Sequence, residues 1–484
     1  MARPPSVSIH IRVRAPGRRA CAEDIVRTVA EDIASGRLSK GLRLPPVREL
    51  EHQLGISKNT VQAAYDELVA RGLAEARARD GVYTASPGIA EKDPFPSLGA
   101  APLAFTPPRL PPPARRVPGQ IELSTVFIDP ELLPVTQLTD CFRSVLSSPG
   151  LVPFYDAQGY PPLRAAIAER LRGRGMEVDA DDVVLTTGSQ QALDMVGRAL
   201  SGGCVALEEP VYSYARLLFE DLGKEVVPLP LDPFGGPPLE VWAERIGKAR
   251  PSLLYAITSY QNPTGYSYST YEMVQLLEMS KHYGFALLED DWGSDMLSCG
   301  EYRPTLRALG GKHVLYANSF TKKLLPALRV GYIVGSPETR DVLVAEKRLS
   351  TLANVAVTEA VVHEFLDRGY YDTHLKRVQA ALDERYLGCL GALEELMPEG
   401  VRWSTPGGGP TLWLEVPRSI DLPSLRERLF RKGVTIEDSR NHFSGAPHLH
   451  GFRVSYAYLA PDRLRQALER LAEALSEEAR RSIA

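Results

Sequence analysis

A proline-rich stretch at residues 87–118 divides this chain into two parts. It holds 10 prolines in 32 residues. Because proline fixes φ and lacks an amide hydrogen, such a stretch cannot form a helix or the interior of a sheet. An extended polyproline-type chain rises about 3.1 Å per residue, so the stretch can span up to roughly 100 Å. We therefore predict a linker at 87–118, with a small domain at 15–86 before it and a large domain at 119–484 after it.

The composition of the whole chain is that of a globular protein. Its 484 residues are 44% hydrophobic and 24% charged. No apolar run approaches the roughly 18 residues of a membrane span, and the basic N-terminus lacks the long apolar core of a signal peptide. The five cysteines are scattered and form no CxxC pair. We therefore expect reduced thiols, a cytoplasmic location, no membrane partner and no cysteine-based metal site.

Charge is distributed unevenly along the chain. Residues 1–86 contain 14 Lys and Arg against 10 Asp and Glu, a net charge of +4, whereas the rest of the chain has a net charge of −8. A basic unit followed by an acidic one indicates a polyanionic partner for the first unit only.

The small domain shows the pattern of a helix-turn-helix. Helical periodicity runs from about Arg19 to Ser35, and a second helix begins in the segment LPPVREL. Gly55 makes a tight turn, and Ser57 caps a third helix. Two short helices joined by such a turn form a helix-turn-helix. The third helix is predicted to bury an apolar stripe of four residues: Val61, Tyr65, Leu68 and Val69.

Polar and basic residues of this domain are suited to duplex DNA. In helix-turn-helix proteins the first turns of the second helix of the motif enter the major groove. Asp80 and Gly81 then separate two strand-like runs, which predicts a hairpin wing. A helical protein-interaction module with solvated charges is the alternative. The predicted DNA-binding residues are Arg43, Arg48, Ser57, Lys58, Asn59, Thr60, Gln62, Arg77 and Arg79.

The segment from GRLSKGLRLPP to DGVYTAS resembles the winged helix-turn-helix of GntR-type bacterial regulators over its whole length. The motifs LPPVREL and SKNTVQAAYDEL carry the match. The wing departs from the family, because ARDGVYT replaces the usual glycine-rich xGxGT. The resemblance implies that this domain binds double-stranded DNA.

The large domain alternates apolar strand-like runs with helical segments. The runs are VVLTT, CVALEE, LLYAIT, ALLEDD, HVLYANS and VGYIVG. This alternation predicts an α/β fold with a largely parallel sheet covered by helices. Ligands bind such folds at the carboxyl ends of the strands. From about Thr373, a charged helix and the runs GGGPTLWLEV and GFRVSYAYL predict a small α+β unit at the C-terminus.

The stretch NSFTKKLLPALR, residues 318–329, combines groups suited to a phosphorylated aldehyde. Ser319 and Thr321 precede Lys322, and Arg329 follows it. Hydroxyl groups and a planar guanidinium suit a phosphate, and a lysine within such a site can form a Schiff base. We therefore predict pyridoxal 5'-phosphate (PLP) as the cofactor. A surface pair of Lys322 and Lys323 is the alternative.

Further groups with suitable chemistry stand after other predicted strands. Ser189 and Gln190 open a helix whose amide groups can hold an anion. Tyr212 can stack on an aromatic cofactor or belong to the core. Asn262, at a Pro-Gly turn, can donate to a phenolate oxygen. Asp290, at a strand end, can pair with a pyridinium nitrogen or cap a helix.

These motifs occur in the order found in fold-type I aminotransferases, and the resemblance covers roughly residues 120–475. The segment FYDAQGYPPLRAAIAERL also resembles that family's Tyr-x-x-x-x-Gly-x-x-x-Leu-Arg segment. The resemblance implies that Lys322 forms the internal aldimine with PLP and that Asp290 holds the pyridine nitrogen. It also implies ring and phosphate contacts from Ser189, Gln190, Tyr212, Asn262, Trp292, Ser319, Thr321 and Arg329.

Four positions bear on catalysis and on ligand choice. Trp292 stands where the family commonly has a tyrosine that donates to the ring oxygen. Phe154, next to Tyr155, stands where a tyrosine reaches the neighbouring subunit's phosphate. Arg453 stands where aminotransferases bind a substrate carboxylate, and Arg440 matches an effector-binding position in some regulators of this build. A surface salt bridge is the alternative for each arginine.

Taken together, the head, linker and body resemble the MocR (GabR-like) subfamily of transcription regulators. The resemblance implies a homodimer that binds operator DNA and uses PLP to sense an amino acid or related amine through an aldimine. A working aminotransferase that carries a DNA-binding head is the alternative. A body that has lost PLP and only dimerises is a third interpretation, which the complete set of cofactor residues argues against.

Overall fold

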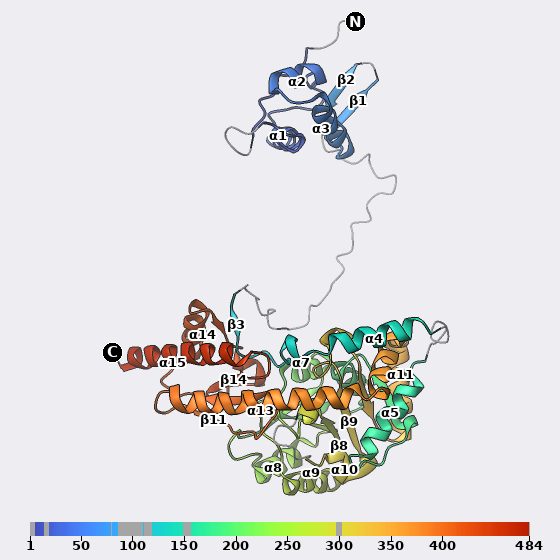
Figure 1. The fold of residues 1–484 in the computed structure, drawn as a ribbon, viewed down its shortest axis with the longest axis vertical. Helices are drawn as coiled ribbons and strands as arrows, with labels where there is room; N and C mark the ends of the chain where they lie inside the picture. Colours follow the sequence, from blue (N-terminus) through green and yellow to red (C-terminus); the bar gives the residue numbers. More distant parts are fainter. Residues whose placement is uncertain are drawn as a thin grey trace. The chain divides into compact units, whose positions relative to one another are not determined.

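The computed structural model describes residues 5–13, 19–78, 80–85, 110, 119–148, 156–296 and 303–483. The chain forms two compact units, Met1–Pro107 and Pro108–Ala484 (Figure 1). Apart from Leu110, the predicted linker at 87–118 lies outside the described residues. The boundaries at 86 and 119 therefore stay predictions.

The N-terminal unit consists of three helices and a hairpin. Gly55 has a left-handed φ of 64° that ends the second helix, and the Ser57 hydroxyl accepts a hydrogen bond from the Thr60 amide at 3.1 Å. These contacts form the turn and the cap that the sequence predicted. The elements are α1 (Ala22–Ala34), α2 (Val47–Leu54), α3 (Lys58–Ala70), β1 (Ala74–Arg77) and β2 (Gly81–Thr84), with the two strands antiparallel.

A single apolar core lies between these helices. Ile9 and Ile11 are buried in it, so the core extends before residue 15, where we expected the domain to start. Val69 was predicted to be buried but is 37% exposed. At 3.6 residues per turn, Val69 lies about 80° around the helix from Val61, whereas Leu68 lies only about 20° away. The buried helical residues include Ile25, Val29, Leu50, Val61, Tyr65 and Leu68.

The C-terminal unit is built on a seven-stranded mixed sheet. The strand order is β4-β10-β9-β8-β7-β5-β6, and only β10 runs antiparallel to its neighbours. Each of the six predicted runs forms a strand, but β6 was missed because its sequence EVVPLP contains two prolines. Strand β6 lies at the edge of the sheet, where proline is tolerated. The strands are β4 (Val183–Thr186), β5 (Cys204–Glu209), β6 (Glu225–Pro230), β7 (Leu253–Ala256), β8 (Ala286–Asp290), β9 (Val314–Ser319) and β10 (Gly331–Val334).

Helices cover both faces of this sheet, because alternate residues of each buried strand point to opposite sides. In β5, Val205 and Leu207 pack with α6 (Ser189–Ala199), α7 (Ser213–Asp221) and α13 (Tyr370–Leu396). Ala206 packs instead with α8 (Leu239–Ala249), α9 (Thr270–Tyr283) and α10 (Leu306–Gly310), which lie together along one side of the body in Figure 1. The remaining large-domain helices are α4 (Val135–Leu146), α5 (Pro161–Arg172), α11 (Pro337–Ser350) and α12 (Ala356–Asp367).

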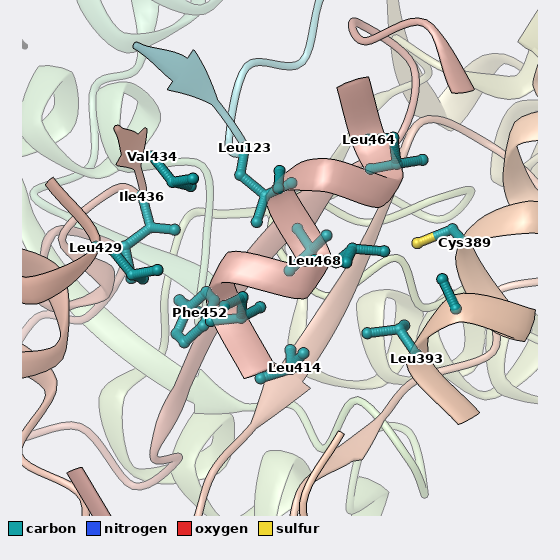
Figure 2. Packing of buried hydrophobic residues seen from close by; sticks show 14 of the residues in the cluster. Leu123, Cys389, Leu393, Leu414, Leu429, Val434, Ile436, Phe452, Leu464 and Leu468 are labelled. Atoms are coloured by element: carbon teal, nitrogen blue, oxygen red, sulfur yellow. The ribbon is translucent and has the colours of Figure 1, made fainter. Parts of the chain in front are cut away.

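A smaller α+β domain completes the body, as predicted. Its core packs residues of α13 and of two later helices against residues of the strands, including Leu414, Phe452 and Leu468 (Figure 2). A short strand from the start of the body pairs in parallel with a strand near its end, so both ends of the body build this domain. The elements are β3 (Ile121–Glu122), β11 (Arg402–Trp403), β12 (Thr411–Glu415), α14 (Leu422–Arg431), β13 (Val434–Thr435), β14 (Gly451–Ser455) and α15 (Pro461–Ile483).

Across the described ranges, no helix combines the length and the apolar character needed to cross a membrane.

Candidate functional site

A cavity of about 130 Å³ lies at the carboxyl ends of β8 and β9 and beside the start of α6. Every predicted cofactor-binding residue lines it, although these residues come from five separate segments of the chain. Phe127 and Ile257 also line it and were missed. Ile257 directly follows β7, a strand-end position that could have been considered, whereas no sequence signal marked Phe127. The lining residues are Phe127, Ser189, Gln190, Tyr212, Ile257, Asn262, Asp290, Trp292, Ser319, Thr321, Lys322 and Arg329.

Lys322 lies among aromatic rings in this cavity. Its Nζ is 3.9 Å from the centroid of the Trp292 ring and 5.7 Å from that of Tyr212. Burial lowers the pKa of Lys322, and the charge of Asp290 opposes that effect only in part. A lysine with a lowered pKa has a larger neutral fraction, which is the form that attacks a carbonyl.

Lys323 has a different environment from Lys322. Its Nζ lies 3.0 Å from Asp295 Oδ2 and donates to Asn318 Oδ1 at 2.6 Å. Asp295 also pairs with Arg174 at 3.2 Å. Lys323 is therefore held in a buried polar network and does not line the cavity, which supports the choice of Lys322 as the cofactor lysine.

Asp290 presents one unpaired carboxylate oxygen at the end of β8. Its Oδ2 accepts a hydrogen bond from the Tyr255 hydroxyl at 3.0 Å, whereas Oδ1 is buried without a partner in the described part of the chain. Burial raises the pKa of Asp290, and the nearby Lys322 charge opposes that rise. A buried, half-satisfied carboxylate of this kind suits a cationic partner such as a pyridinium nitrogen.

The lining residues around the start of α6 form a cradle for an anion. Gly188 precedes α6 with a φ of 99°, and a Cβ there would lie 2.9 Å from Arg329 Nη2. Glycine therefore permits the guanidinium to approach the helix start closely, where backbone N–H groups favour an anion. Thr321 Oγ1 is buried without a partner among the described residues. Ser319 is partly engaged, because its Oγ donates to the Val330 carbonyl at 3.2 Å.

Arg453 lies next to this cavity and donates hydrogen bonds to three acceptors. Its Nη1 donates to Asn262 Oδ1 at 2.5 Å. Its Nη2 donates to the Ser124 carbonyl at 2.8 Å and to the Glu437 carboxylate. Arg453 is buried, with 8% of its surface exposed, so the surface salt bridge that we considered as an alternative does not describe it.

Arg440 does not line the cavity that contains Lys322, so its predicted role in binding an effector carboxylate stays a prediction. The side chain is 62% exposed and pairs with Asp438 at 2.6 Å. The Asp438 side chain also accepts a hydrogen bond from the Arg440 amide at 3.2 Å. It therefore caps the 3-10 turn Ser439–His442 and holds the Arg440 side chain close to that turn. Arg440 instead lines a separate cavity of about 210 Å³ that also contains Arg426.

Most of the predicted DNA-binding residues are exposed on the N-terminal unit. Among them, Gln62 is held by a 2.9 Å hydrogen bond to Asp66, and Arg77 lies 4.2 Å from the Tyr83 ring centroid. Arg43 is half-buried against Gly81, so the structure places it under the wing and not on the open face of α3. Thr60 is also half-buried, and Arg79 lies outside the described residues, as do Phe154 and Tyr155 of the body. The exposed residues are Arg48, Ser57, Lys58, Asn59, Gln62 and Arg77.

Comparison with known proteins finds relatives of both units. Residues 129–471 match the family described as aminotransferase class I and II, and residues 21–84 match the gntR family of bacterial regulatory proteins. The HTH-type transcriptional regulator TauR of Rhodobacter capsulatus is 29% identical over 485 residues, covering 95% of this chain and 98% of that protein. The probable rhizopine catabolism regulatory protein MocR of Rhizobium meliloti is 27% identical over 457 residues, covering 92% and 91% of the two chains.

A solved structure resembles the body in sequence and fold. It is the α-aminoadipate aminotransferase LysN of Thermus thermophilus, complexed with N-(5'-phosphopyridoxyl)-L-leucine. The TM-score is 0.70 at 31% identity, and the match covers 75% of this chain and 94% of that one. The predicted fold is therefore confirmed: a GntR-type helix-turn-helix precedes an aminotransferase body of fold type I.

Proposed function

This chain belongs to the aminotransferase class I and II family, and from that premise we propose that it is a transcription regulator whose PLP-binding body senses an amino acid or related amine. One observation carries the proposal: a cavity lined by every predicted cofactor-binding residue and a GntR-type head occur in one chain. The alignments with the regulators MocR and TauR support the proposal, since each covers more than nine tenths of the chain.

The residues that line the cavity fit PLP. Four of its polar atoms are buried without a partner among the described residues: Asp290 Oδ1, Thr321 Oγ1, Trp292 Nε1 and Gln190 Oε1. A ligand with a ring nitrogen and a phosphate can supply partners for the first two of these. When bound, PLP supplies an electrophilic carbon that primary amines attack and a ring that withdraws electrons.

Each group of the cavity then has a defined task. Lys322 holds the cofactor covalently, and Asp290 keeps the ring nitrogen protonated. The anion cradle holds the phosphate, and the amide of Asn262 donates to the ring oxygen. Tyr212 and Trp292 are the aromatic side chains beside Lys322, and they exclude water and orient the ring. The anion cradle consists of Ser189, Gln190, Ser319, Thr321 and Arg329.

The effector that we propose is a primary amine that bears a carboxylate. Only a primary amine can exchange with Lys322, which supports the amine requirement. The guanidinium of Arg453, next to Asn262, suits a planar carboxylate better than an ammonium group does. The head binds duplex operator DNA through the first turns of α3, and the working unit that we propose is a cytoplasmic homodimer.

A working aminotransferase is the second candidate, because the cavity retains the lysine and aspartate that such an enzyme needs. Two measurements on the holoprotein separate the candidates: effector-dependent footprinting on the promoters of its own and neighbouring genes, and keto-acid formation with a panel of amino acids. We expect an amino acid to change the footprint with little turnover. Multiple-turnover keto-acid formation at an ordinary enzyme rate of about 1 per second or faster would show that the protein is primarily an aminotransferase.

A further inference from the structure

Arg453 uses three of its N–H donors inside the protein, one on Nη1 and both on Nη2, whereas Nε has no partner among the described residues. A guanidinium has five N–H donors, and a planar carboxylate binds it best through two adjacent ones. The two adjacent donor pairs are Nε with Nη2 and Nη1 with Nη2, so both pairs include Nη2. Nη2 already donates to the Ser124 carbonyl and the Glu437 carboxylate. A ligand carboxylate can therefore take a two-point position on Arg453 only after one of these acceptors leaves.

Glu437 is the acceptor that can leave. Ser124 contributes a backbone carbonyl, and its Oγ is tied to the Arg453 carbonyl at 3.0 Å, so it is held within the main-chain framework. The Glu437 amide is fixed by a 3.1 Å hydrogen bond to Ser124 Oγ, but its side chain is 29% exposed. Burial alone would raise the pKa of Glu437, yet the Arg453 charge and, after it, the His442 ring 3.6 Å away lower it to about 2, so the carboxylate is ionised at neutral pH.

A displaced Glu437 carboxylate also has a place to go. Glu437 lines the separate cavity of about 210 Å³ that contains Arg426 and Arg440. Both arginines contact Asp438 there, at 2.7 and 2.6 Å, and neither pairs with Glu437 in this structure. Rotation of the Glu437 side chain toward this cavity would exchange one cationic environment for another without leaving the carboxylate unsolvated.

We propose that Glu437 determines ligand choice at Arg453: its carboxylate forms an internal ion pair that a ligand carboxylate must break and that a simple amine leaves intact. The proposal rests on the proposed function, because it assigns the ligand carboxylate to Arg453. Under this proposal Glu437 competes with the ligand carboxylate for Arg453. The apparent affinity for amino acids is then lower, since only molecules in which Glu437 has left Arg453 can bind them. It also means that amino acids, and not simple amines, move Glu437 and give a distinct structural response.

The test compares ligands that differ only in the carboxylate. Full-length protein carrying PLP is titrated with L-alanine and with ethylamine, and the absorbance of the cofactor reports binding. The Glu437→Gln variant should bind L-alanine about tenfold more tightly or better, with the affinity for ethylamine nearly unchanged. Glu477→Gln is the matched control, because Glu477 is a carboxylate of the same small domain that pairs with Arg428 and Lys432 instead. That control should change neither affinity.

A second titration separates this proposal from the proposed function. Propionate, which has a carboxylate and no amine, is titrated by calorimetry into the wild type, Glu437→Gln and Glu437→Asp. The proposal expects tighter propionate binding in both variants, because the shorter aspartate cannot reach Arg453 from the same backbone position. If no amine changes the absorbance, amine sensing fails while propionate still decides the role of Glu437. Unchanged or weaker binding of both carboxylate ligands in the variants would overturn the proposal.

Discussion

At the scale of the residue, two adjacent lysines differ in their access to the cavity and in their charge partners. Lys322 faces the cavity, and burial lowers its pKa. Lys323 instead forms an ion pair with Asp295 and a hydrogen bond to Asn318. We expect borohydride reduction followed by peptide mapping to place the pyridoxyl group on Lys322. Lys322→Ala should abolish the covalent label but leave the protein folded, because the side chain makes no ion pair with another residue of the described ranges.

The neighbouring lysine provides the control for that experiment. Lys323→Met should retain the label on Lys322 but lower stability, since it leaves Asp295 buried with one cationic partner fewer. Losing one partner of a buried pair typically costs about 3–5 kcal/mol. A pyridoxyl group found on Lys323 in the wild-type protein would contradict the assignment.

At the scale of the element, α3 presents its first turns to solvent and buries the stripe that holds it to α1 and α2. Lys58 stands at the first position of the helix and is exposed. We expect Lys58→Ala to weaken binding to the operator duplex by about 1–3 kcal/mol if the side chain reads a base edge, and less if it meets a phosphate. Gel shifts at two salt concentrations distinguish these cases, because a lost phosphate contact reduces the salt dependence.

The same helix supplies a matched control at its other end. Arg71 caps the C-terminus of α3, is exposed, and pairs with Glu67 at 2.7 Å. Arg71→Ala removes an equal charge from the same helix, about three turns away from Lys58. Operator affinity should be almost unchanged in that variant. Equal losses in both variants would show that the unit contributes only general charge and that α3 does not enter the groove.

At the scale of the whole molecule, the two units have separate cores and should unfold separately. All four tryptophans, Trp242, Trp292, Trp403 and Trp413, belong to the body, so their fluorescence reports on that unit alone. Removing PLP should lower the fluorescence-detected melting temperature, because a ligand at 100 times its Kd stabilises the folded state by about 2.7 kcal/mol. The calorimetric transition of the N-terminal unit should not move.

The fluorescence and calorimetric transitions, compared with and without PLP, distinguish coupled unfolding of the two units from independent unfolding. A single transition detected by both methods, shifted as a whole by PLP removal, would mean that the two units are thermodynamically coupled. Two transitions of which only the body's depends on the cofactor would agree with the separate cores.

The local pattern of the sequence was sufficient for most of the elements, although it missed strand β6, and for ten of the twelve residues that line the cavity. Six strand-like runs and three N-terminal helices form where apolar periodicity placed them, because burial on one face dictates that periodicity. Lys322, Asp290 and Asn262 come together because each follows a strand or turn at the same edge of the sheet, and topology brings those edges to one place.

Contacts between distant segments were decided only by the tertiary structure. Strand β3 pairs with β13, more than 300 residues later, and Phe127 reaches the cavity from the same early segment; no local spacing reports either contact. Arg440 and Arg453 are both arginines near strands of one small domain, yet Asp438 draws the first into a separate cavity. Glu437 pairs with the second across 16 positions of sequence. Side-chain direction and charge pairing depend on three-dimensional neighbours, so the sequence could name candidate arginines but not their partners.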